Sequence, residues 1–117
     1  MVVPRYFPRR GDFIWLNFTP QAGHEQSGRR SALVISHNEY NRKVGLLLAC
    51  PLTTQQKGYP FEVLIPVGLP VSGVILADQV RSLDWRMRQA LFIAKAPEGV
   101  LAETLSKLGA LTTESDP

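Results

Sequence analysis

Three groups of polar residues interrupt the otherwise apolar segments of this chain, and each carries side chains that could do chemistry. The first is Gly23–Arg30, where two glycines bracket a carboxylate, an amide, a hydroxyl and two guanidinium groups. The second is Thr53–Lys57, and the third comprises Asp78, Gln79 and Arg81. Loops collect polar residues for solvation alone, so each group also has a structural interpretation. For Asp78 that interpretation is an anchor whose carboxylate accepts backbone N–H bonds.

The elements that must position these groups are short strands. Gly and Pro, nine of each, fall between short apolar runs rich in Val, Ile, Leu and aromatic residues, which favours strand over helix. The runs are Phe13–Phe18, Ala32–Ser36, Leu46–Leu52, Phe61–Ile65 and Val74–Val80, with Gln89–Lys95 as one more expected strand. Asn38–Arg42 fits a single helical turn between two of them.

The last segment changes its period. Apolar residues from Val100 to Leu111 recur at intervals of three and four, which is typical of an amphipathic helix, and Pro97 suits its first turn. We therefore expect one mainly β domain over residues 1–111, a small antiparallel barrel or sandwich with a C-terminal helix, followed by a polar tail at 112–117.

Charge is unevenly distributed along the 117 residues. Residues 1–88 hold 11 of the 13 Lys and Arg and 6 of the 10 Asp and Glu, a net charge of +5, whereas the rest carries −2. Arginine dominates the basic part and suits bidentate recognition of phosphate. The single cysteine, Cys50, excludes an intramolecular disulfide and a cysteine-based zinc site. Because no apolar run approaches about 18 residues and no signal peptide is evident, we expect a cytoplasmic protein without a membrane partner.

The polar groups and the segments around them resemble the MazF/PemK family of toxin ribonucleases, over about Tyr6 to Leu108. The residues that carry the resemblance are Gly11–Trp15, Phe18, Gly23–Val34, Pro51, Thr53–Thr54, Lys57–Glu62 and Gly73–Ser82. The resemblance implies an SH3-like antiparallel barrel (MazF/CcdB-like) with a C-terminal helix, working as a homodimer. It also implies sequence-specific cleavage of single-stranded mRNA without metal or other cofactor, and a MazE-like antitoxin partner with an acidic C-terminal tail.

The resemblance assigns catalysis to Glu25, Arg30 and Thr53. These residue types suit RNA, which supplies its own nucleophile in the 2′-OH. Glu25 is the expected general base, Arg30 would stabilise the charge on the phosphorane, and Thr53 would donate a hydrogen bond to a non-bridging oxygen. The products would be a 2′,3′-cyclic phosphate and a 5′-OH. Ser31 stands where most members have proline, which would fix φ at the start of the second strand.

A wider set of residues is expected to bind the RNA strand, the aromatic ones by stacking on bases and the cations by pairing with phosphates. These residues are Trp15, Gln26, Arg29, Lys57, Tyr59, Gln79 and Arg81.

Three alternatives stay open on the sequence. The chain could be a gyrase poison like CcdB, which shares the implied fold. It could be an RNA-binding module without activity, with Ser31 marking a decayed site. Within the nuclease hypothesis, His24 and His37 could serve as the acid and the base in place of the expected residues.

Overall fold

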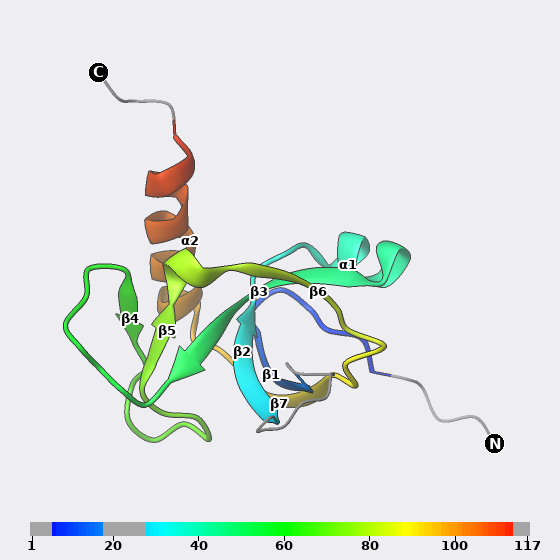
Figure 1. Ribbon diagram of the computed structural model, residues 1–117, viewed down its shortest axis with the longest axis horizontal. Coiled ribbons are helices and arrows are strands. Elements are labelled where there is room, and N and C mark those ends of the chain that lie inside the picture. Colours follow the sequence, from blue (N-terminus) through cyan, green and yellow to red (C-terminus); the bar gives the residue numbers. More distant parts are fainter. Residues whose placement is uncertain (1–5, 18–27, 114–117) are drawn as a thin grey trace.

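Seven strands and a C-terminal helix make up most of the protein (Figure 1). The computed structural model describes residues 6–17 and 28–113, and the structural statements below concern this part of the chain. The elements in chain order are β1 (Asp12–Asn17), β2 (Arg29–Val34), α1 (Asn38–Val44), β3 (Leu46–Thr53), β4 (Glu62–Leu64), β5 (Val74–Leu76), the 3-10 turn η1 (Ala77–Gln79), β6 (Arg81–Asp84), β7 (Leu91–Lys95) and α2 (Glu98–Thr112).

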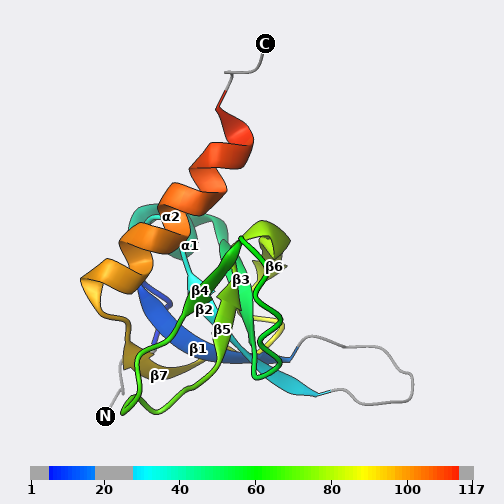
Figure 2. The same cartoon turned by 90° about the vertical axis from the view of Figure 1, so that its left-hand side faces the viewer.

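All the strand pairs are antiparallel, and the strands follow the order β4-β5-β3-β2-β1-β7 with β6 also paired to β3. The eight-residue β3 pairs with β6 through its first four residues and with β5 through Leu52 and Thr53. This division curls the sheet, and α2 lies against β4 and η1 (Figure 2). The expected mainly β, barrel-like fold with a C-terminal helix is confirmed, although β4 and β7 do not pair to close the sheet within the described residues.

The core forms on both faces of the central strands. Alternate residues of a strand point to opposite faces, so neighbouring residues of β1 enter different clusters. Phe13 packs with Leu33 and Cys50 in a cluster that α2 covers through Val100. Ile14 packs with the buried residues on the other face, which are Leu16, Ala32, Val34, Leu47, Ala49, Leu83 and Trp85.

The prediction of a single strand over Val74–Val80 is wrong. The chain leaves the sheet after Leu76, makes the turn η1, and returns as β6 to pair with a different part of β3. The turn is fixed by the Ala77 amide, which donates to the Phe61 carbonyl at 3.0 Å. The apolar run is continuous because both strands are half-buried, and that continuity hides the change of pairing partner.

The remaining predicted elements are present with shifted ends. The helical turn at Asn38–Arg42 is α1, which extends to Val44, and the strand at Gln89–Lys95 is β7, which begins at Leu91. The amphipathic C-terminal helix is α2, with Pro97 at its N-cap position. No helix among the described residues is long and apolar enough to cross a membrane.

Two buried polar side chains attach the segment before β1 to the rest of the fold. Asp12 is 2% exposed and accepts hydrogen bonds from the Tyr6 phenol at 2.6 Å and from the Arg9 amide at 2.9 Å. Burial and this carboxylate raise the pKa of Tyr6 far above its usual range. Asn41 is fully buried, and its amide donates to the Pro8 carbonyl at 3.0 Å. The two contacts fix the start of β1 against α1.

Candidate functional site

The ends of four strand segments converge on one cavity of about 380 Å³. The start of β2 contributes Arg30, the end of β3 contributes Thr53, and the start of β6 contributes Arg81. The end of β5 contributes Leu76, and the other lining residues are Pro51, Leu52 and Gln79. The cavity therefore brings together residues from all three polar groups that the sequence singled out: Arg30 from the first, Thr53 from the second, and Gln79 and Arg81 from the third.

Strand register explains why Arg30 and Thr53 meet. β2 pairs with β3 through Ala32 opposite Pro51, and continuing this register by two residues brings Arg30 opposite Thr53. Cross-strand partners point to the same face of a sheet. Arg29, one residue earlier, pairs with Asn17 of β1 and lies on the opposite face. Arg30 therefore faces the cavity with Thr53, whereas Arg29 lies on the other face of the sheet.

The polar groups in this cavity are arranged to receive an anion. Arg30 is exposed, and its side chain makes no hydrogen bond or ion pair with any residue in 6–17 or 28–113, so its guanidinium can turn toward a ligand. The Thr53 hydroxyl oxygen accepts the Gln55 amide at 3.1 Å, which leaves the hydroxyl hydrogen available for donation. Two guanidinium groups and a hydroxyl donor around one cavity can stabilise negative charge that develops on a bound group.

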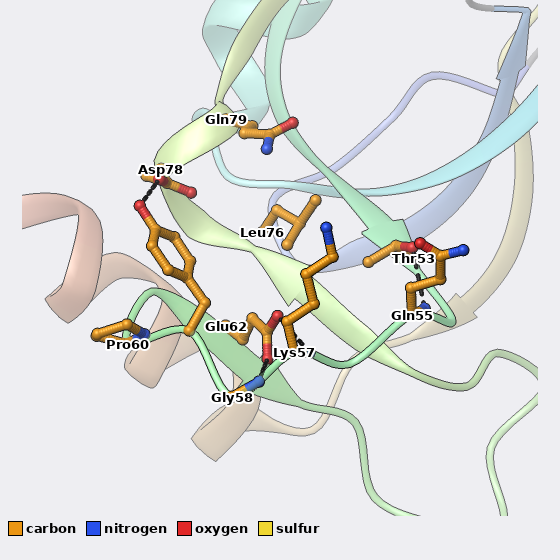
Figure 3. A pocket seen from close by; sticks show the side chains of 10 residues that line it. Thr53, Gln55, Lys57, Gly58, Pro60, Glu62, Leu76, Asp78 and Gln79 are labelled. Atoms are coloured by element: carbon orange, nitrogen blue, oxygen red, sulfur yellow. Dashed lines mark hydrogen bonds between the residues drawn. The ribbon is translucent and has the colours of Figure 1, made fainter.

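A second cavity of about 580 Å³ adjoins the first and shares Thr53, Leu76 and Gln79 with it (Figure 3). It is formed largely by the loop between β3 and β4. The Glu62 carboxylate holds that loop by accepting the amides of Lys57 at 3.0 Å and Gly58 at 3.1 Å. The other lining residues are Gln55, Tyr59, Pro60 and Asp78. The cations that line the two adjoining cavities are Arg30, Lys57 and Arg81.

One wall of the second cavity is closed by a contact between Tyr59 and Asp78 (Figure 3). The phenol donates to Asp78 Oδ2 at 2.8 Å, and this hydrogen bond raises the pKa of Tyr59 above its usual value. The other carboxylate oxygen, Oδ1, is buried and has no hydrogen-bond partner among the described residues. The expectation that Asp78 anchors backbone N–H groups is therefore wrong, because it holds a side chain 19 residues away.

The structure brings together six of the residues expected from the sequence: Arg30, Thr53, Lys57, Tyr59, Gln79 and Arg81. It does not bring Trp15 or Arg29 to them. Trp15 pairs with Ser31 and Leu91, lies 40% exposed on the face opposite Arg30, and lines neither cavity. The expected residues Glu25 and Gln26 lie outside the described residues.

Sequence reasoning gave Asp78 a different role and missed Glu62. The signal for Glu62 was an acidic residue a few positions after the Lys57–Gly58 turn, a spacing that lets a carboxylate accept the amides of the turn. For Asp78, the sequence carried no signal of its partner, because Tyr59 reaches it only across the β4–β5 pairing.

The alternative of two catalytic histidines loses support. His37 precedes α1, at the end of β3 remote from Thr53, and its ring nitrogen lies 3.5 Å from the Arg10 guanidinium. It lines neither cavity described above. His24 lies outside the described residues. Within the described part of the chain, no group of three or more His, Cys, Asp or Glu side chains could hold a metal ion.

Comparison with known proteins gives one consistent result. Residues 9–112 match the family model described as the PemK-like, MazF-like toxin of type II toxin–antitoxin systems. The endoribonuclease toxin MazF of Escherichia coli K12 is 53% identical over 89 residues, covering 76% of this chain and 79% of that protein. A crystal structure of MazF from Deinococcus radiodurans is 60% identical with a TM-score of 0.84, covering 92% of this chain and 98% of that one. A MazE–MazF structure from the same organism is 59% identical with a TM-score of 0.90, covering 95% of this chain and all of the matched chain.

Proposed function

Since this chain belongs to the family of PemK-like, MazF-like toxins of type II toxin–antitoxin systems, we propose that it is an endoribonuclease that cleaves single-stranded mRNA. The observation that carries the proposal for the site is the cavity that Arg30, Thr53 and Arg81 line together. A protein that only binds gyrase does not need a hydroxyl and two guanidinium groups around one cavity. A nuclease does, because the phosphodiester group of RNA can accept hydrogen bonds from the hydroxyl and from the guanidinium groups.

The proposed reaction uses the 2′-OH of the substrate as nucleophile. The 2′ oxygen attacks the adjacent phosphorus, its proton passes to a base, and the bond from phosphorus to the 5′ oxygen breaks as that oxygen gains a proton. Arg30 and Arg81 would neutralise the extra charge of the phosphorane, and Thr53 would donate to a non-bridging oxygen. We propose Glu25 as the base and leave the acid unassigned, because a guanidinium with a pKa above 12 is a poor proton donor.

The second cavity would hold a nucleotide next to the cleaved bond. Its volume of about 580 Å³ is in the range of ligand pockets, roughly 300 to 1,000 Å³. Tyr59 supplies a ring on which a base can stack, and Lys57 extends toward Gln79, where a phosphate or base edge would lie (Figure 3). Trp15 and Arg29 lie on the other face, so we propose them only as outlying contacts to the strand.

The reaction as proposed proceeds without a metal ion. The positive charge that a metal would bring to the phosphorane comes from guanidinium groups, which are charged at every working pH. Cleavage would leave a 2′,3′-cyclic phosphate and a 5′-OH, and would stop translation of the cut message.

The same cations would also be the target of the antitoxin. An acidic tail like that expected of a MazE-like partner offers carboxylates to Arg30, Lys57 and Arg81, so it would compete directly with RNA. The solved MazE–MazF complexes of D. radiodurans support a partner of this kind. We infer that the toxin meets both ligands in the cytoplasm, with the whole activity in the single domain of residues 1–111.

We infer further that the toxin works as a homodimer. Trp15 of β1 and Leu91 of β7 are cross-strand partners and leave an apolar surface on one face of the sheet, with exposed fractions of 40% and 54%. A second copy of the 13.0 kDa chain would remove this surface from water. Light scattering at micromolar concentration should therefore give twice the mass of the chain, and a monomer would contradict this inference.

The test of the proposed function is incubation of the purified toxin with a defined transcript in EDTA, followed by mapping of the RNA ends. Cleavage at specific sites with cyclic phosphate ends is expected. Intact RNA together with stalled gyrase would instead identify a gyrase poison. RNA that is bound but stays intact would identify a binding module whose site has decayed, and restoration of cleavage by Mg²⁺ would contradict the metal-free mechanism.

A further inference from the structure

Five of the described cations lie outside both cavities, at the end of β3 remote from Thr53. They are Arg9, Arg10, Arg42, Lys43 and Arg86, and we call them the distal basic cluster. They surround α1, which links the segment before β1 to the turn after β6. The Arg10 amide donates to Asn38 Oδ1 at 2.8 Å, and the Arg86 guanidinium donates to the Arg42 carbonyl at 3.2 Å.

The cluster keeps a net positive charge after its local ion pairs are counted. Glu39 pairs with Arg42 at 2.8 Å and with Lys43 at 3.8 Å. The Asp84 carboxylate accepts the backbone amides of the turn that follows β6. Five cations against these two carboxylates leave three positive charges, so the surface attracts polyanions.

A cavity of about 410 Å³ opens within the cluster, between three aromatic residues and two guanidinium groups. Its lining residues are Tyr6, Phe7, Arg42, Trp85 and Arg86. The Arg86 guanidinium lies 4.9 Å from the centre of the Trp85 ring, and the Arg9 guanidinium lies 4.2 Å from that of Phe7. Because a guanidinium lies over each of these rings and Trp85 is only 9% exposed, a base would stack on the flat guanidinium groups of Arg9 and Arg86, which the rings support from behind.

The strand β6 connects this cluster to the proposed active site. β6 begins at Arg81, which lines the cavity with Thr53, and ends at Asp84, two residues before Arg86 (Figure 1). At about 3.3 Å per residue the strand advances roughly 10 Å from Arg81 to Asp84, and the turn that follows carries Arg86. A single strand of RNA leaving the active site along β6 would therefore meet the distal basic cluster within a few nucleotides.

We propose that the distal basic cluster binds the part of the RNA strand that flanks the cleaved segment, with one nucleotide in the cavity between Phe7, Trp85 and Arg86. The inference rests on the proposed function and adds a second contact region to it. An acidic peptide would also be attracted by the charge, but the flat guanidinium groups stacked on aromatic rings and the continuity through β6 favour RNA.

The test compares two RNAs, a short oligonucleotide that holds the cleavage motif and the same motif extended on both sides. Arg9→Gln and Arg42→Gln, separately and together, remove exposed guanidinium groups of the cluster. Lys107→Gln is the control for loss of a cation outside the cluster: its ammonium pairs with Glu103 one helical turn away and donates to the Glu62 carbonyl at 2.8 Å, so any effect it has acts on the site that both RNAs occupy. Thermal melting of every variant confirms that it is folded.

The cluster variants should raise KM for the extended RNA several-fold and leave its kcat unchanged. For the short oligonucleotide, both KM and kcat should stay as in the wild type. The salt dependence of binding to the extended RNA should become shallower by about 0.7 in log–log slope for each phosphate that the variant no longer binds. Lys107→Gln should affect the short and the extended RNA equally, so the difference between the two RNAs should stay as in the wild type. For the cluster variants, equal effects on the two RNAs, an unchanged KM and slope, or weakened binding of an acidic peptide alone would overturn the inference.

The same experiment separates this inference from the proposed function. Cleavage of the short oligonucleotide by the wild-type toxin tests the proposed function by itself. If neither RNA is cleaved, the proposed function fails, and the dissociation constants of the extended RNA for wild type and cluster variants still decide whether the cluster binds it.

Discussion

The position of Thr53 depends on a glycine in a neighbouring loop, and substitution of that glycine is a sharp test of the site. Gly73 precedes β5 with φ of +104°, and a Cβ added there would lie 2.2 Å from the Thr53 carbonyl oxygen. Ordinary van der Waals contact begins at 3.4 Å, so Gly73→Ala forces the two backbones apart by about 1 Å. A displacement of this size at a group that positions a reacting bond costs roughly 10²-fold in rate.

Gly68 provides the matched control. It lies in the same β4–β5 connection with φ of +99°, but a Cβ there meets nothing within 4 Å. Both alanine variants carry the backbone cost of a side chain at positive φ, about 1–3 kcal/mol. Only Gly73→Ala adds the clash with Thr53, which should lower the free energy of unfolding by roughly another 1–3 kcal/mol.

Urea unfolding measures the difference in the free energy of unfolding between the two variants. Single-turnover cleavage of RNA, at a temperature where both variants are folded, measures the difference in cleavage rate. We expect Gly73→Ala to be less stable than Gly68→Ala and about 10²-fold slower, with Gly68→Ala close to wild type in rate. If the two variants are equal in stability and in rate, the placement of Thr53 against Gly73, and with it the geometry of the site, is wrong.

Arg30→Ala should lower kcat by roughly 10² to 10³, the cost of removing one charge-stabilising donor, whereas Arg29→Ala should only weaken RNA binding; the reverse order in single-turnover rates would exchange the two assignments. Asn41→Ala should cost about 1–3 kcal/mol in urea unfolding without changing kcat, because it leaves buried polar groups unpaired; a loss of kcat with unchanged stability would speak against a purely structural role. Tyr59→Ala should raise KM about 10-fold because a base can no longer stack on the ring, while Tyr59→Phe should raise it less. Because Asp78 raises the pKa of Tyr59 above its usual value, the phenol does not titrate near neutral pH, so Tyr59→Phe should leave the shape of the pH–rate profile between about pH 6 and 9 unchanged; a changed shape would contradict this assignment.

The central strands and the C-terminal helix could be predicted because their apolar periods are local. The division of Val74–Val80 between β5, η1 and β6 could not, since it depends on β3 accepting two partners along one edge. In the sequence, the only indication that the apolar run Val74–Val80 is interrupted is the pair of polar residues Asp78 and Gln79 within it.

The site was predicted unevenly for a similar reason. Arg30 and Thr53 followed from the family resemblance, and their meeting in one cavity requires only the β2–β3 register. Trp15 was expected near them but lies on the other face of the sheet. A shift of one residue in strand register moves a side chain to the opposite face, and the local sequence around Trp15 does not determine that register. The contact between Tyr59 and Asp78 spans 19 residues and forms only when β4, β5 and η1 are assembled.

The most direct test of the proposed mechanism is a single 2′-deoxy substitution in an RNA oligonucleotide, at the nucleotide just before the mapped cleavage site. In that mechanism this 2′-OH is the nucleophile, and the cavity with Arg30 and Thr53 holds the adjacent phosphate. The substituted oligonucleotide should bind with nearly unchanged affinity and remain uncut in EDTA, while a 2′-deoxy nucleotide two positions away should leave cleavage intact. Cleavage at the substituted position, at a rate close to that of the unmodified RNA, would contradict the mechanism.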